Sequence, residues 1–190
     1  MNEDLLFYIE MLAAAVSLLG VWLTSRKKLH GWTLGFIGSV MYTAIFFVSG
    51  LYAESTLQIF YAFMGVYGWL KWKNETTETQ TAVKRIPLKT IVSSVLITAA
   101  LSFVAGAFLD RFSDSTVPYL DASLAAAGLV ITLLMAKRFV ENWLAWIVVD
   151  LVSAALYFDR GLHITAVVYL FLTAMAIYGF FHWKRELRTA

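Results

Sequence analysis

The stretch MGVYGWLKW at Met64–Trp72 returns 111 residues later as MAIYGFFHW at Met175–Trp183. Methionine, tyrosine, glycine and the final tryptophan stand at the same places in both stretches. Aligned outward without gaps, Glu10–Trp72 and Asp121–Trp183 are identical at 14 of 63 positions. Because few residue types dominate apolar sequence, shared tryptophan and glycine are harder to obtain by chance than shared leucine or alanine. The pattern predicts two copies of one structural unit.

More matches lie outside that stretch. Two consecutive basic residues occur at the same place in both copies, as Arg26-Lys27 in the first and Lys137-Arg138 in the second. The other identical pairs include Trp32/Trp143, Gly50/Gly161, Leu51/Leu162 and Phe60/Phe171.

The composition is that of an integral membrane protein. Of the 190 residues, 60% are hydrophobic and 15% are charged, whereas soluble domains contain about 45–50% apolar residues. The formal net charge of +2 is too small to indicate a nucleic-acid partner. The chain has no cysteine, which excludes disulfide frameworks and thiolate metal sites.

Charged and polar clusters divide the chain into seven apolar segments. Each is about long enough to cross a hydrocarbon core of roughly 30 Å as a helix. The predicted spans are Leu5–Leu23, Trp32–Val48, Ala53–Trp69, Ile91–Leu109, Leu120–Ala136, Asn142–Phe158 and Ile164–Phe181. We therefore expect an all-α bundle of seven transmembrane helices in the lipid bilayer.

Basic residues orient the bundle, because short cytoplasmic loops collect lysine and arginine. All but two of the 15 basic residues follow the first, third, fifth or seventh span; the exceptions are Arg111 and Arg160. This asymmetry predicts an N-terminus outside and a C-terminus inside.

Each repeat contains three spans, and the fourth span lies between them. Because each copy has an odd number of spans, joining the copies directly would invert the second one in the membrane. One linker helix between them restores a parallel orientation. Parallel repeats of this kind occur among transporters with mid-membrane substrate sites. The predicted 3+1+3 division is residues 5–72, then 73–119 with a flexible cytoplasmic linker (Lys73–Lys89), the fourth helix and an outer loop, then 120–183, and a cytoplasmic tail at 184–190.

No enzyme motif is present, so we expect neither catalytic residues, nor a cofactor, nor a bound metal. Polar groups at membrane depth are costly and therefore indicate function. The sixth span places Asn142, Trp143, Trp146 and Asp150 on one helix stripe that we expect to face the interior.

Other spans offer polar groups at similar depth. These are Gln58 and Tyr61 in the third span, and Tyr169 and Thr173 in the seventh. The two copies thus present different polar groups at matched positions, as expected if an asymmetric small molecule binds between them. Aromatic rings, amides and one carboxylate suit a flat ligand that is cationic and carries hydroxyls. For Trp32, Trp69, Trp72 and Trp183, we expect an interfacial aromatic belt.

The ENWLAW stretch (Glu141–Trp146), the segment from Gln58 to Tyr61 and the glycine and tryptophan residues near both repeat ends together resemble the PnuC family of bacterial nicotinamide riboside transporters. The resemblance implies uptake of this vitamin B3 nucleoside by facilitated diffusion across the bacterial inner membrane. It also implies trapping by a cytoplasmic riboside kinase and a homotrimer. The implied site comprises Trp143, Asn142, Trp146, Asp150, Gln58 and Tyr61.

Two alternatives stay open. One is a transporter of another flat vitamin, thiamine or riboflavin. The other is an intramembrane sensor or enzyme that uses Asp150, although no second catalytic group at its depth is evident.

Overall fold

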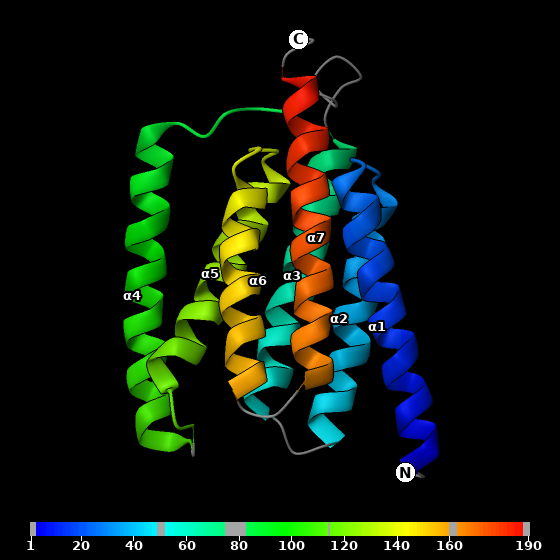
Figure 1. The fold of residues 1–190 in the computed structure, drawn as a ribbon, viewed down its shortest axis with the longest axis vertical. Coiled ribbons are helices and arrows are strands. Elements are labelled where there is room, and N and C mark those ends of the chain that lie inside the picture. Colours follow the sequence, from blue (N-terminus) through cyan, green and yellow to red (C-terminus); the bar gives the residue numbers. More distant parts are fainter. Residues whose placement is uncertain (1–2, 49–51, 75–82, 114, 160–162, 188–190) are drawn as a thin grey trace. The chain divides into compact units, whose positions relative to one another are not determined.

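The computed structural model describes residues 3–48, 52–74, 83–113, 115–159 and 163–187, and this part of the chain is built from seven α-helices (Figure 1). In chain order the helices are α1 (Glu3–Ser25), α2 (His30–Val48), α3 (Tyr52–Lys73), α4 (Leu88–Phe112), α5 (Pro118–Ala136), α6 (Asn142–Asp159) and α7 (His163–Glu186). Each predicted span lies within one of them. The all-helical prediction is therefore confirmed.

Six of the described helices have the length and composition of membrane spans. Among the described residues, all except α3 are long and apolar enough to cross a bilayer. The 22 residues of α3 include Glu54, Gln58, Lys71 and Lys73, which lower its hydropathy. The membrane span predicted at Ala53–Trp69, within α3, therefore stays a prediction.

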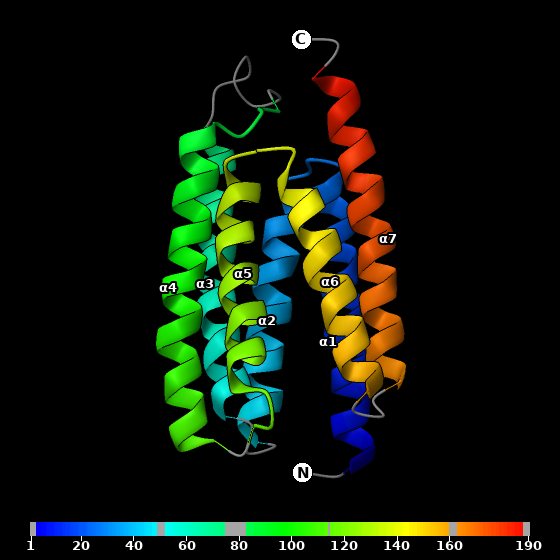
Figure 2. The ribbon, with the colours of Figure 1, turned by 60° about the vertical axis from the view of Figure 1, so that its left-hand side comes forward.

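The helices form two compact units, residues 1–82 and 83–190. In the first unit α2 packs against both α1 and α3. In the second unit each helix packs on the next, and α4 lies along α5 (Figure 2). The boundary between the units falls inside the predicted linker, while the 3+1+3 arrangement itself stays a prediction.

The loops after α1 and α5 have the same backbone conformation, as the repeat predicts. Lys27 and Arg138, which are 111 positions apart, both have positive φ, 57° and 58°. In each loop this residue donates its N–H to the carbonyl three residues earlier, Thr24 or Met135, at 2.9 Å. The matched pairs Gly50/Gly161 and Leu51/Leu162 lie outside the described residues.

Each unit also contains one buried tryptophan pair. The rings of Trp32 and Trp72 meet edge to face, 5.5 Å between centroids and 85° between planes. Trp143 and Trp183 repeat this geometry at 5.4 Å and 89°. The aromatic-belt prediction was wrong for Trp32, Trp72 and Trp183, because these side chains are buried in the protein and do not face lipid.

Glycine allows α2 to lie close to α1. A Cβ on Gly31 would stand 2.5 Å from the backbone N of Thr24, whereas one on Gly35 would meet no atom within 4 Å. Asn142 occupies the position equivalent to Gly31 in the second repeat. The second unit therefore carries an amide side chain where the first unit has none.

The structure departs from the flexible-linker prediction at the C-terminal end of that segment. Val83 is buried, and Lys84 forms a parallel bridge with Phe139. Residues 83–87, here named the strap, are therefore attached to the loop between α5 and α6.

Candidate functional site

The polar stripe on α6 begins directly at the end of the α5–α6 loop. Two turn hydrogen bonds start the helix, from Asn142 N to Phe139 O at 3.2 Å and from Trp143 N to Val140 O at 3.3 Å. Helix geometry of about 100° per residue places Asn142, Trp143, Trp146 and Asp150 within an arc of about 100°. Four side chains thus share one face.

That face is turned inward, as predicted. The exposed fractions are 0% for Asn142, 1% for Trp143 and 3% for Asp150, and Trp146 is half-buried. Buried polar groups are normally hydrogen-bonded within the protein or to a bound partner. Whether the polar atoms of these four side chains have hydrogen-bond partners in the protein therefore indicates whether this face binds a ligand.

Three buried atoms on this face have no hydrogen-bond partner among the described residues. They are Asn142 Oδ1, Trp143 Nε1 and Trp146 Nε1, and they make up half of the six such atoms in the described part of the chain. Leaving a buried donor or acceptor unpaired costs about 1–3 kcal/mol. One acceptor and two donors on a single stripe are ready to pair with a ligand that itself both donates and accepts.

The two α6 tryptophans differ in what their rings can offer. Trp143 is packed against Trp183 and against α7 so closely that a Cβ on Gly179 would stand 2.7 Å from its Cδ2 and Cε2 atoms. Its ring faces are therefore occupied by protein. Trp146 is only half-buried, so it is the α6 indole with ring surface left for a ligand.

Asp150 has a carboxyl group with little exposure and no cationic partner among the described residues. Ser153, one turn further along α6, is equally buried. An unpaired buried charge is expensive. A cationic ligand near Asp150 would offset that cost.

The two predicted site residues on α7, Tyr169 and Thr173, differ in which of their groups are already used within the protein. The Thr173 hydroxyl donates to Tyr169 O at 2.9 Å, within its own helix, so its proton is already used. The half-buried Tyr169 ring stacks on Tyr157 of α6, with 5.3 Å between centroids and 19° between planes. Sequence reasoning missed Tyr157, although its position seven residues after Asp150 continues the α6 stripe.

The other two predicted residues, Gln58 and Tyr61, lie half-buried on α3 of the first unit. Near them, Gly65 allows α3 to approach Phe36 of α2, since an added Cβ would stand 3.1 Å from the Phe36 side chain. The predicted meeting of the α3 pair with the α6 stripe stays a prediction.

An apolar groove of about 610 Å³ lies between α2 and α3 and contains none of the predicted site residues. Its walls include Phe36, Phe47, Ile59 and Phe63. Binding sites for polar small molecules need a few convergent hydrogen-bonding groups, and the α6 stripe meets this requirement better.

Comparison with known proteins gives matches over nearly the whole chain. Residues 7–185 match the sequence profile of a family described as nicotinamide mononucleotide transporter. The chain is 27% identical to the nicotinamide riboside transporter PnuC of Escherichia coli (strain K12), over 96% of this chain and 87% of that protein. It is also 27% identical to the riboflavin/roseoflavin transporter RibM of Streptomyces davaonensis, over 94% and 85% of the two chains.

A solved structure has the same fold. The crystal structure of the vitamin B3 transporter PnuC superposes with a TM-score of 0.74, covering 96% of this chain and 83% of that one at 23% sequence identity. These matches are all to membrane transporters.

Proposed function

The chain belongs to the nicotinamide mononucleotide transporter family, a family of multi-pass membrane proteins, and from that premise we propose that it carries nicotinamide riboside across the bacterial inner membrane. It acts as a carrier and not as an enzyme. The observation that supports this substrate most directly is the set of unpaired buried atoms at Asn142, Trp143 and Trp146.

The hydrogen-bonding groups of the nucleoside complement that set. Its carboxamide has an NH₂ group that can donate to Asn142 Oδ1 and a carbonyl that can accept from an indole N–H. The ribose hydroxyls both donate and accept. Binding therefore satisfies protein atoms that otherwise stay unpaired, and this distinguishes the nucleoside from an apolar molecule of similar size.

The charge of the nucleoside fits the same helix. Nicotinamide riboside contains a pyridinium ring, which is flat and cationic. An indole face attracts such a ring by roughly 2 kcal/mol or more when water is excluded, and Trp146 is the α6 tryptophan that is only half-buried. The Asp150 carboxylate, one helical turn deeper, adds attraction for the positive charge.

Charge also argues for the nucleoside over its mononucleotide. No lysine or arginine occurs in α6 or in α7 before Lys184. A phosphate needs a cationic partner when it leaves water. The α6 stripe offers no such cation; its one charged side chain is the Asp150 carboxylate, which repels a phosphate.

We extend the proposal to the transport mode. Asp150 is the only acid in α6 before Asp159, so the α6 stripe contains no chain of acids that would relay protons. The lack of such a relay supports facilitated diffusion, and the resemblance to the PnuC family supports trapping of the product through phosphorylation by a cytoplasmic riboside kinase. The resemblance to the PnuC family further supports a homotrimer as the working assembly.

We propose that the N-terminus lies outside and the C-terminus inside, because 13 of 15 basic residues follow odd-numbered spans. Alkaline phosphatase fused after Ala190 is expected to be inactive, since this enzyme needs the periplasm, while green fluorescent protein at the same place should fluoresce. The opposite pair of results would contradict the orientation.

The substrate is tested with the purified full chain in liposomes and by titration calorimetry. The panel is nicotinamide riboside, nicotinamide mononucleotide, thiamine and riboflavin. We expect riboside to bind and to equilibrate across the membrane without an ion gradient, with the mononucleotide at least tenfold weaker. Preferential binding of riboflavin, which the similarity to RibM keeps as the second candidate, or of thiamine would reassign the substrate and leave the carrier function intact.

A further inference from the structure

The strap is joined to the α5–α6 loop by main-chain hydrogen bonds. Lys84 N donates to Arg138 O at 2.9 Å, and Val140 N donates to Lys84 O at 2.9 Å. The two bonds flank Phe139, the residue that Lys84 faces in the bridge. The strap therefore restrains the backbone on both sides of Phe139.

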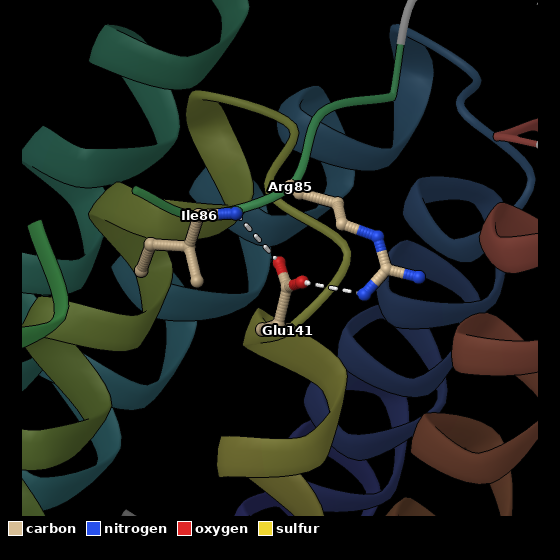
Figure 3. Close-up of polar contacts among 3 residues, drawn as sticks. All are labelled: Arg85, Ile86 and Glu141. Carbon is tan, nitrogen blue, oxygen red and sulfur yellow. Dashed lines mark hydrogen bonds and ion pairs between the residues drawn. The ribbon is translucent and has the colours of Figure 1, made fainter. Parts of the chain in front are cut away.

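Glu141 adds a side-chain clamp to this attachment. Its Oε2 accepts a hydrogen bond from Ile86 N at 2.9 Å, and its Oε1 lies 4.0 Å from Arg85 Nη1 (Figure 3). The Arg85 side chain is 75% exposed, so that ion pair contributes little. The bond from Ile86 N is the stronger one, since a carboxylate that accepts from a backbone N–H makes a charge-assisted hydrogen bond.

The same loop sets the direction of the Asn142 amide. Asn142 Nδ2 donates to Phe139 O at 2.6 Å, which leaves Asn142 Oδ1 without a described partner. The carbonyl that orients this amide thus belongs to the residue that the strap restrains. Glu141 itself is the last residue before α6, and its own carbonyl accepts from Ala145 N at 3.2 Å.

The first repeat lacks both parts of this arrangement. His30 and Gly31 occupy the positions equivalent to Glu141 and Asn142. The loop backbone is the same in both units, as the matching positive φ angles of Lys27 and Arg138 show. The clamp and the amide therefore occur together, in the unit that carries the α6 stripe.

We propose that Glu141 is a positioning residue for substrate binding: by clamping the strap to the α5–α6 loop, it holds Phe139 O and thereby aims Asn142 Oδ1 at the ligand. The proposal rests on the proposed function for the identity of that ligand. Glu141 does not touch the substrate.

The test compares Glu141→Ala, Glu141→Gln and Arg85→Ala in the purified full chain. Glutamine keeps a side-chain oxygen that accepts from Ile86 N, whereas alanine removes it. We expect Glu141→Ala to weaken riboside binding roughly tenfold by calorimetry, because an Asn142 amide that is no longer held must be ordered when the ligand binds. Glu141→Gln and Arg85→Ala should remain within about twofold of the wild type.

Hydrogen–deuterium exchange supplies a readout that is independent of the ligand. In Glu141→Ala, the amides of Lys84, Ile86 and Val140 should exchange at least tenfold faster, while amides of the helices exchange as in the wild type. Faster exchange together with wild-type riboside affinity would overturn the proposal, and so would a glutamine variant as weak as alanine.

Failure of the proposed function gives a different pattern. In that case the wild type itself binds no riboside, and the comparison is made with whichever vitamin of the panel it does bind. If it binds none, unchanged exchange in Glu141→Ala overturns the clamp, and faster exchange confined to the strap and residues 138–143 supports it.

Discussion

Replacing Trp146 by alanine is expected to reduce riboside uptake by about a hundredfold while the protein still folds. The half-buried ring offers a face to the pyridinium, and its Nε1 is one of the unpaired buried donors. Loss of a desolvated cation–π contact, at roughly 2 kcal/mol or more, together with one hydrogen bond corresponds to about two orders of magnitude in affinity. Uptake into liposomes measures the effect.

Two further variants separate the parts of this effect. Trp146→Phe keeps an aromatic face and removes Nε1, so we expect a loss of about tenfold. Trp22→Ala is the matched control, because this exposed indole lies on α1 with Arg26 over its ring at 4.7 Å; its uptake should stay within about twofold of the wild type. Unchanged uptake in Trp146→Ala would remove Trp146 from the site.

Gly179→Ala is expected to destabilise the second unit and to abolish much of the transport. The added Cβ would stand 2.7 Å from two atoms of the Trp143 ring, which cannot move aside because Trp183 packs against it. Overpacking of this kind costs about 1–3 kcal/mol. For a chain of this size, that corresponds to a decrease of roughly 2–12 °C in the thermal midpoint.

The first repeat provides a parallel case and a control. Gly68→Ala should behave in the same way, since its Cβ would come within 2.4 Å of the Trp32 ring. Gly35→Ala should leave the midpoint within about 2 °C or raise it, because nothing lies within 4 Å of that Cβ and alanine favours helix. Equal midpoints for Gly179→Ala and Gly35→Ala would show that the Trp143 ring can adjust.

The sequence by itself determined the seven helices, because an apolar run between charged clusters has one stable form in a bilayer, a helix of matching length. It also determined the duplication, since Trp32/Trp143, Trp72/Trp183 and Gly68/Gly179 recur at one offset. The single stripe on α6 followed from spacing alone, because the period of a helix is a local property. Its inward direction was expected from the cost of polar groups at membrane depth.

Only the tertiary structure decided which surfaces the helices cover. The spacing of Trp32 and Trp72 places both near span ends, where a lipid-facing belt is the usual outcome. Whether the Trp32 ring is buried instead depends on Gly68 of the neighbouring helix α3, which leaves room for it. The Trp72 ring is buried with its edge-to-face partner Trp32. Likewise, nothing in a polar linker sequence indicates that Ile86 N meets a carboxylate 55 residues away. Contacts between segments far apart in the chain arise from packing, and a local pattern does not contain them.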